Sequence, residues 1–186
     1  MITLIVVIVI IGALIGFVVS LYNALVRARQ TAEEAWSGID VQLKRRADLI
    51  PNLVETVKGY ASHERGTLEE VVEKRNKAQS VAANDVAGRA QAEGELTQAL
   101  GRLFALSEAY PDLKANQNFA DLQASLEKTE SEIQMARRYY NGAARDLNIK
   151  VESFPSNIIA GQFGFQKRDY FEIEEPGDRA VPNVSF

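Results

Sequence analysis

The sequence lacks the residues on which most metal and nucleophilic sites depend. It has no cysteine and one histidine, His63. Without cysteine there are no disulfides, no thiolate chemistry and no sulfur-rich metal site. The His63-Glu64 pair is not followed by a second histidine four residues later, so the metalloprotease motif is absent. A carboxylate-bridged metal site of the bundle type would require Glu-x-x-His, which does not occur.

Phosphate and nucleic-acid recognition are also poorly supported. The glycines at 161 and 164 are too close together for a phosphate loop, and no lysine and hydroxyl pair follows them. The chain has 21 basic and 25 acidic residues, a net charge of -4, and no sustained basic run. We therefore predict a protein that is not an enzyme, with no cofactor, no bound metal and no nucleic-acid partner.

What the sequence does contain is a long apolar run at its start. Residues 2–26 include no charged residue. About 20 apolar residues at roughly 1.5 Å each cross the hydrocarbon core of a bilayer. A cleaved signal peptide would have a basic start, a shorter apolar core and a small-x-small cleavage site. We predict instead that residues 1–26 form a transmembrane anchor in the lipid bilayer.

Basic residues lie only on one side of this run. None precedes it, and five follow it: Arg27, Arg29, Lys44, Arg45 and Arg46. Positive charge is retained on the cytoplasmic side of a membrane. The N-terminus is therefore expected outside the cell membrane and the C-terminal domain in the cytoplasm.

Small residues recur every four positions within and just after the anchor. They are Gly12, Gly16, Ser20 and Ala24. Such spacing forms a groove in which two membrane helices approach closely, which predicts a homo-oligomer. The alternative is that glycine and alanine are simply frequent in membrane helices.

Residues 27–170 read as a helical domain. Apolar residues three or four apart continue from the anchor without a turn signal, which predicts one helix running from the membrane into the domain. Pro51 either kinks this helix or divides it in two. Residues 84–94, rich in alanine and glycine, are expected to form a loop or a weakly packed helix end.

The strongest helical pattern lies between residues 119 and 147. Its apolar residues alternate at spacings of three and four, typical of coiled-coil packing. Asn118, three residues before Asp121, is expected to cap the helix. The predicted fold is all-α: an N-terminal transmembrane helix followed by an antiparallel bundle of long helices. The stripe consists of Phe119, Leu122, Leu126, Thr129, Ile133, Ala136, Tyr140, Ala143 and Leu147.

The end of the chain is rich in aromatic residues. This segment either folds back over one end of the bundle or forms an interaction surface for another copy, the membrane interface or a partner. Residues 171–186 are predicted to be an acidic, flexible tail. The candidate surface residues are Phe154, Phe163, Phe165, Tyr170 and Phe171.

Several strings together resemble the LemA family of bacterial membrane-anchored proteins, over nearly the whole chain. Tyr170-Phe171 departs slightly, since two phenylalanines are more usual there. The matching strings are RADLIPNLV (46–54), VKGYA (57–61) with His63-Glu64, YPDLKAN (110–116), Tyr140-Asn141, FPSNIIA (154–160) and FGF (163–165).

The resemblance implies a short extracytoplasmic N-terminus, one membrane span, an antiparallel helical bundle and no established enzymatic activity. Relatives are associated with intracellular membrane formation in magnetic bacteria and often sit beside a membrane metalloprotease. The leading hypothesis is a scaffold that self-associates and organises or remodels the bacterial membrane. The rival is an adaptor that presents substrates or signals to a membrane partner such as that metalloprotease.

Overall fold

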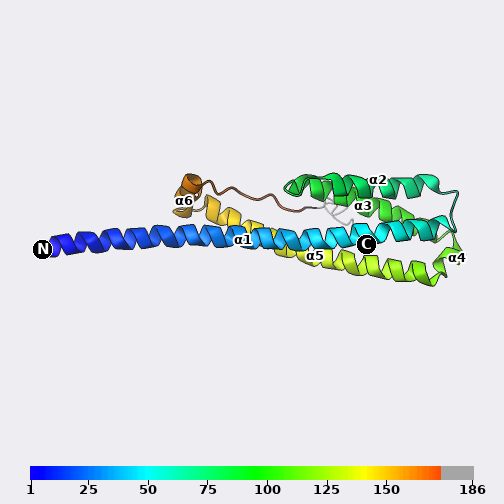
Figure 1. The fold of residues 1–186 in the computed structure, drawn as a ribbon, viewed down its shortest axis with the longest axis horizontal. Helices are drawn as coiled ribbons and strands as arrows, with labels where there is room; N and C mark the ends of the chain where they lie inside the picture. The colour runs from blue at the N-terminus through cyan, green and yellow to red at the C-terminus, as the bar shows by residue number, and fades with distance from the viewer. Residues whose placement is uncertain (173–186) are drawn as a thin grey trace, which may run out of the picture. The chain divides into compact units, whose positions relative to one another are not determined.

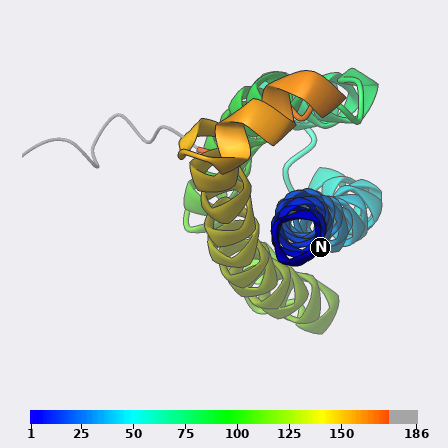
Figure 2. The same cartoon turned by 90° about the vertical axis from the view of Figure 1, so that its left-hand side faces the viewer.

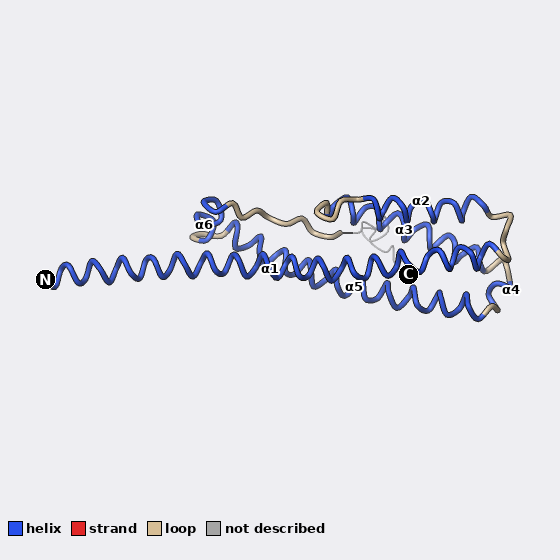
Figure 3. The backbone as a smooth tube through the Cα atoms, in the orientation of Figure 1, coloured by secondary structure: helices blue, strands red, loops and turns tan. Residues whose placement is uncertain are grey.

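The computed structural model describes residues 1–172, and this part of the chain is helical without any strand (Figure 3). The predicted all-α class is confirmed. The predicted tail lies almost wholly outside the described residues, which include only its first two positions. The helices are α1 (Ile2–Lys58), α2 (Arg65–Ser80), α3 (Val86–Ser107), α4 (Pro111–Lys114), α5 (Gln117–Glu152) and α6 (Ser156–Phe163) (Figure 1).

The chain divides into two units, each with its own core. The first consists of Met1–Gly38 and Ala136–Tyr170. Among the described residues, the second consists of Ile39–Met135 and residues 171–172. Two helices, α1 and α5, contribute residues to both units.

Helix α1 settles the alternatives for Pro51, because the proline lies inside one helix rather than between two. A proline has no backbone N–H, so the carbonyl of Ala47 four residues earlier loses its helical partner. The Nε of Arg75, on α2, donates to that carbonyl at 2.7 Å. A neighbouring helix thus satisfies the acceptor that the proline leaves free.

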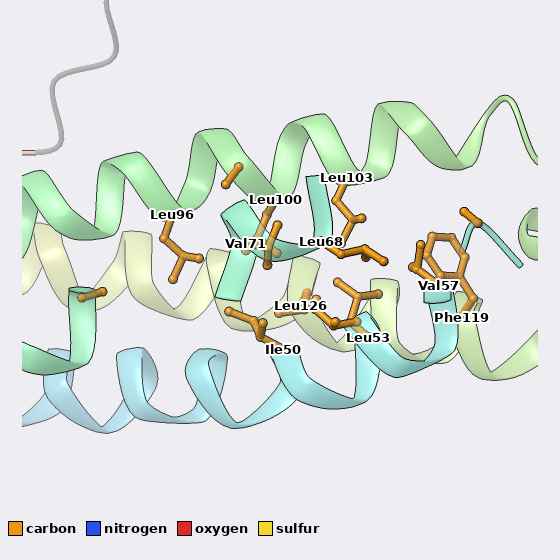
Figure 4. Packing of buried hydrophobic residues seen from close by; sticks show 14 of the residues in the cluster. Ile50, Leu53, Val57, Leu68, Val71, Leu96, Leu100, Leu103, Phe119 and Leu126 are labelled. Carbon is orange, nitrogen blue, oxygen red and sulfur yellow. The ribbon is translucent and has the colours of Figure 1, made fainter. Parts of the chain in front are cut away.

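The second unit is a bundle whose successive segments run in opposite directions (Figure 1). Its core is aliphatic, with Ile50, Leu53 and Val57 of α1 facing side chains from α2, α3 and α5 (Figure 4). Burial of such side chains stabilises the fold by about 1.5–3 kcal/mol each. The facing residues include Leu68, Val71, Leu96, Leu100, Leu103, Phe119 and Leu126.

The prediction that residues 84–94 form a loop or a weakly packed helix end is wrong. Helix α3 begins at Val86, and the Asp85 side chain accepts a hydrogen bond from the Gly88 N–H at 2.8 Å. Ala90 and Ala92 are buried. Small side chains here mark close packing of a helix rather than a weak end.

The stripe on α5 is confirmed as the helix's buried face. Seven of its nine residues are buried, while Leu122 and Ala136 are half-buried. The predicted cap at Asn118 is wrong. Asn116 occupies that role, since its Oδ1 accepts from the Phe119 N–H at 3.0 Å and Asn118 already lies within the helix.

Candidate functional site

The first turns of α1 are apolar and lack any cover from the described chain. Every residue from 1 to 20 is exposed, and the mean hydropathy of an 18-residue window reaches 3.3 with none of it buried. Figure 2 looks along α1 from its N-terminus, and Figure 1 shows that α6 and the end of α5 lie beside a later part of α1 than these turns. By length and composition the segment is a candidate membrane span.

The small-residue positions lie on this uncovered part or at its edge. An added Cβ at Gly12 or Gly16 would meet nothing within 4 Å. The hydroxyl of Ser20 donates to the Phe17 carbonyl at 2.8 Å, which removes its polar group from an apolar surround. Ala24 is half-buried, as is Leu21, so protein cover begins in this turn of α1.

The five aromatic candidates separate into two groups. Phe154, Phe163 and Tyr170 are exposed. Phe165 and Phe171 are buried, which corrects their assignment to an interaction surface. Phe165 packs with Leu25 and Ala160 in the core of the first unit.

A glycine turn explains why Phe165 points inward. Gly164 ends α6 at a φ of 70°, a conformation that side chains disfavour, and the Phe165 N–H donates to the Ala160 carbonyl at 2.9 Å. The Arg29 guanidinium lies 5.1 Å from the Phe165 ring centroid, within the range of a cation–π interaction. Sequence spacing alone did not distinguish Phe165 from its exposed neighbours.

Helix α6 meets α1 where the uncovered run ends. The Tyr22 ring centroid lies 4.9 Å from that of Phe163 and 5.8 Å from that of Phe165, both edge-to-face. Such geometries are favourable for aromatic pairs. These contacts fix the level of α6 along α1 (Figure 1).

The segment after α6 is held along α5 by hydrogen bonds. Asn148 donates to the Arg168 carbonyl at 2.9 Å and accepts from the Arg168 N–H at 2.8 Å. The Tyr140 hydroxyl donates to the Asp169 carbonyl at 2.8 Å, and burial raises the pKa of that phenol. Residues 165–170 therefore fold back along α5 within the first unit, in line with the first of the two predicted alternatives.

A buried charge cluster in the second unit was missed by the sequence analysis. Arg46, 1% exposed, pairs with buried Glu93 and lies 2.7 Å from a carboxylate oxygen of Glu130. Arg89 pairs with Glu93 at 3.0 Å and reaches Asp40 at 3.4 Å. Interpreting Arg46 only as a topology signal overlooked this link between α1, α3 and α5.

An open groove of about 710 Å³ lies beside the C-terminal end of α1. Its apolar lining includes Val54, Leu68 and Val72. Acidic and basic side chains surround these residues. The charged members are Glu55, Lys58, Arg65, Glu69 and Glu73.

Potential metal ligands do not cluster in the part of the chain that the structure describes. Within residues 1–172, three or more histidine, cysteine or acidic side chains do not gather where they could hold a metal ion. His63 is exposed between α1 and α2. The described residues thus present exposed apolar side chains on α1 and α6 and one open groove.

An N-terminal candidate membrane span joined to a helical bundle defines a membrane-associated helical protein. The chain belongs to the LemA family, whose profile matches residues 35–186. Magnetosome protein MamQ 2 of Paramagnetospirillum magneticum is 26% identical over 196 aligned residues, 91% of this chain and 72% of the relative. Protein LemA of Metamycoplasma hominis is 27% identical over 151 residues, 81% of this chain and 66% of the relative. None of these names states a catalysed reaction.

Proposed function

We propose that this protein is a non-enzymatic membrane scaffold that self-associates through its anchor and organises the bilayer around it. The observation that carries the proposal is the continuity of α1. The same helix has an uncovered apolar run at one end and core residues such as Ile50 and Leu53 at the other. The described chain has no linker between anchor and bundle, so association of anchors would hold the attached domains close together.

The anchor surface is suited to such association. In lipid, helices associate by close packing and not by hydrophobicity, since the surrounding tails are equally apolar. Gly12 and Gly16 leave open space on one side of α1, and Ser20 lies one turn further along. Arg27 and Arg29 follow the run, which supports a cytoplasmic bundle. The magnetosome relatives are consistent with a role at membranes.

The test is the assembly mass of the full-length protein in mild detergent. A Gly12→Leu, Gly16→Leu double variant should shift a defined oligomer to monomer, because leucines would separate the helix backbones. An Ala13→Leu, Phe17→Leu variant keeps the same spacing on a neighbouring face and should leave the mass unchanged. An oligomer of unaltered mass in the glycine variant would remove this face from the proposal.

The groove beside α1 favours a second candidate, an adaptor that binds an apolar peptide segment of a membrane partner such as a metalloprotease. Val72 is exposed on the groove wall and is suited to carry a photo-crosslinker. Crosslinking in native membranes should then yield a second protein. Recovery of self-contacts alone would count against the adaptor.

A further inference from the structure

We propose that α6, together with Phe154, lies in the headgroup layer of the membrane as a second lipid contact beside the anchor. This proposal rests on the membrane span proposed for α1, but not on self-association. It assigns an occupant to the exposed apolar side chains of this segment. The occupant is a lipid surface, as the composition of the segment, its position along α1 and the charges around it indicate.

The composition of this segment is unusual for a surface exposed to water. No residue from 154 to 166 is charged. Phe154, Ile158 and Phe163 are nevertheless exposed. Only Ala160 of α6 is fully buried, so the helix turns one narrow side to the protein and leaves most of its apolar surface outside. Exposed apolar side chains gathered in one uncharged segment are typical of a contact site.

The depth of α6 relative to the bilayer follows from its aromatic contact with Tyr22 of α1. Residues 2–21 are enough to cross a hydrocarbon core of about 30 Å. Tyr22 is therefore at the boundary between hydrocarbon and headgroups, where aromatic rings concentrate. Since Phe163 packs against Tyr22, α6 lies at the same boundary.

Basic residues begin where the headgroups would lie. Arg27 is five residues beyond Tyr22, about 7.5 Å further along the helix, close to the depth of one headgroup layer. Lys167 is the first charged residue after the uncharged segment 154–166. Its Nζ lies 2.6 Å from a carboxylate oxygen of Glu152. Apolar side chains below a polar, partly basic rim are typical of interfacial helices.

A lipid occupant fits better than a protein partner. The exposed surface of one short helix is small beside the roughly 800 Å² per partner of a stable protein interface. It is also continuous with the uncovered apolar run of α1, through Tyr22. An apolar helix embedded in one leaflet alone would expand that leaflet and would couple the scaffold to membrane curvature.

The absence of native cysteine allows a direct test on the full-length protein in phosphatidylcholine–phosphatidylglycerol vesicles. Single cysteines would replace Ile158, Tyr139 and Ile11 in turn and carry an environment-sensitive fluorophore. Lipids with a nitroxide quencher near the headgroup or deep in the acyl chain would report depth. Tyr139 is the matched control: it is 59% exposed against 60% for Ile158, but lies about 20 Å along α5 from its C-terminal end.

The probe at position 158 should be quenched at least about twofold more by the shallow quencher than by the deep one. The probe at 139 should respond to neither, and the probe at 11 mainly to the deep quencher. Phe154→Ser should reduce quenching at 158, since an apolar lipid contact beside α6 is lost. Phe154 is 79% exposed, so the fold should tolerate the change.

The outcomes distinguish failure of the lipid contact proposed for α6 from failure of the membrane anchor proposed for α1. If position 11 is quenched and position 158 is not, α6 is not a lipid contact while the anchor stands. If position 11 is unquenched, the anchor itself is wrong. Equal quenching at 158 and 139 would also overturn the proposal, because it would indicate non-specific adsorption of the domain.

Discussion

The two ends of α1 belong to one helix but have different surroundings. Near the N-terminus all sides of the helix are apolar and exposed. Near the C-terminus only one stripe is apolar, and Ile39, Leu43, Ile50 and Val57 on that stripe are buried. A helix that is apolar all round requires lipid or a protein interior, whereas a striped helix requires only one neighbouring face. The change in pattern along α1 thus marks the change from membrane to bundle.

The largest effect is expected at Arg46, in the bundle end of α1. Arg46→Met should lower the free energy of unfolding by about 3–5 kcal/mol, because the buried carboxylate of Glu93 loses one of its two arginine partners and Glu130 loses its contact with Arg46. Urea unfolding in mild detergent would measure this change. Arg45→Met, at the exposed neighbouring position, should cost no more than about 0.5 kcal/mol. Equal losses for the two arginines would contradict a structural role for the cluster.

A matched pair of isoleucines contrasts the two ends of the helix directly. Ile50→Ala should destabilise the bundle by about 2–5 kcal/mol, because it removes a fully buried side chain. Ile10→Ala should leave bundle stability unchanged, since the side chain contacts no core. Thermal unfolding of both variants would show the difference, and a comparable loss from Ile10→Ala would break the distinction.

The partner of the Ala47 carbonyl gives a smaller effect. Arg75→Met should cost about 1–3 kcal/mol, because it leaves a partly buried acceptor unsatisfied. In a Pro51→Ala background the same change should cost less, since an alanine N–H restores the helical hydrogen bond. A double-mutant cycle on unfolding free energies measures this coupling. Additive losses would show that Arg75 acts elsewhere.

The smallest expected effect is the pH-dependent contribution of Glu95 to the free energy of unfolding. Hydrogen bonds from Lys77, at 2.7 Å, and Lys74, at 3.0 Å, lower the pKa of Glu95. Because the folded pKa lies below the unfolded value, this stabilisation is present at neutral pH and is lost as the pH falls through the folded pKa. Glu95→Gln should remove about 0.2–1 kcal/mol at pH 7 and nothing at strongly acidic pH. A pH-independent loss would contradict the ion-pair explanation.

Periodic features of the fold could be predicted from sequence, because apolar spacing carries both helix type and buried face. The α5 stripe and the apolar run of α1 are examples. The Arg46–Glu93 pair could not, since a buried ion pair has no period and the same residue types cover helix surfaces. The one available signal was Glu93 among small residues, where close helix packing leaves little solvent access.

The sequence pattern also could not separate the exposed from the buried aromatic residues of the candidate interaction surface. Phe163 and Phe165 are two residues apart in one aromatic string, yet the turn at Gly164 leaves one exposed and the other buried. Asn116 caps α5 instead of Asn118, and this shift of two residues is likewise a local detail. Tertiary contacts decide such cases, and single-sequence patterns do not record them.

The most direct test of the central claim compares two single cysteines on α1 in intact vesicles. Ile15 and Val41 are each 60% exposed, so protein cover does not distinguish them. A charged, water-soluble maleimide should react with Val41→Cys when the domain faces the added reagent, or after the vesicles are opened, and should leave Ile15→Cys unmodified in both cases. Similar modification of the two positions in intact vesicles would show that the first turns of α1 face water and would contradict the membrane anchor.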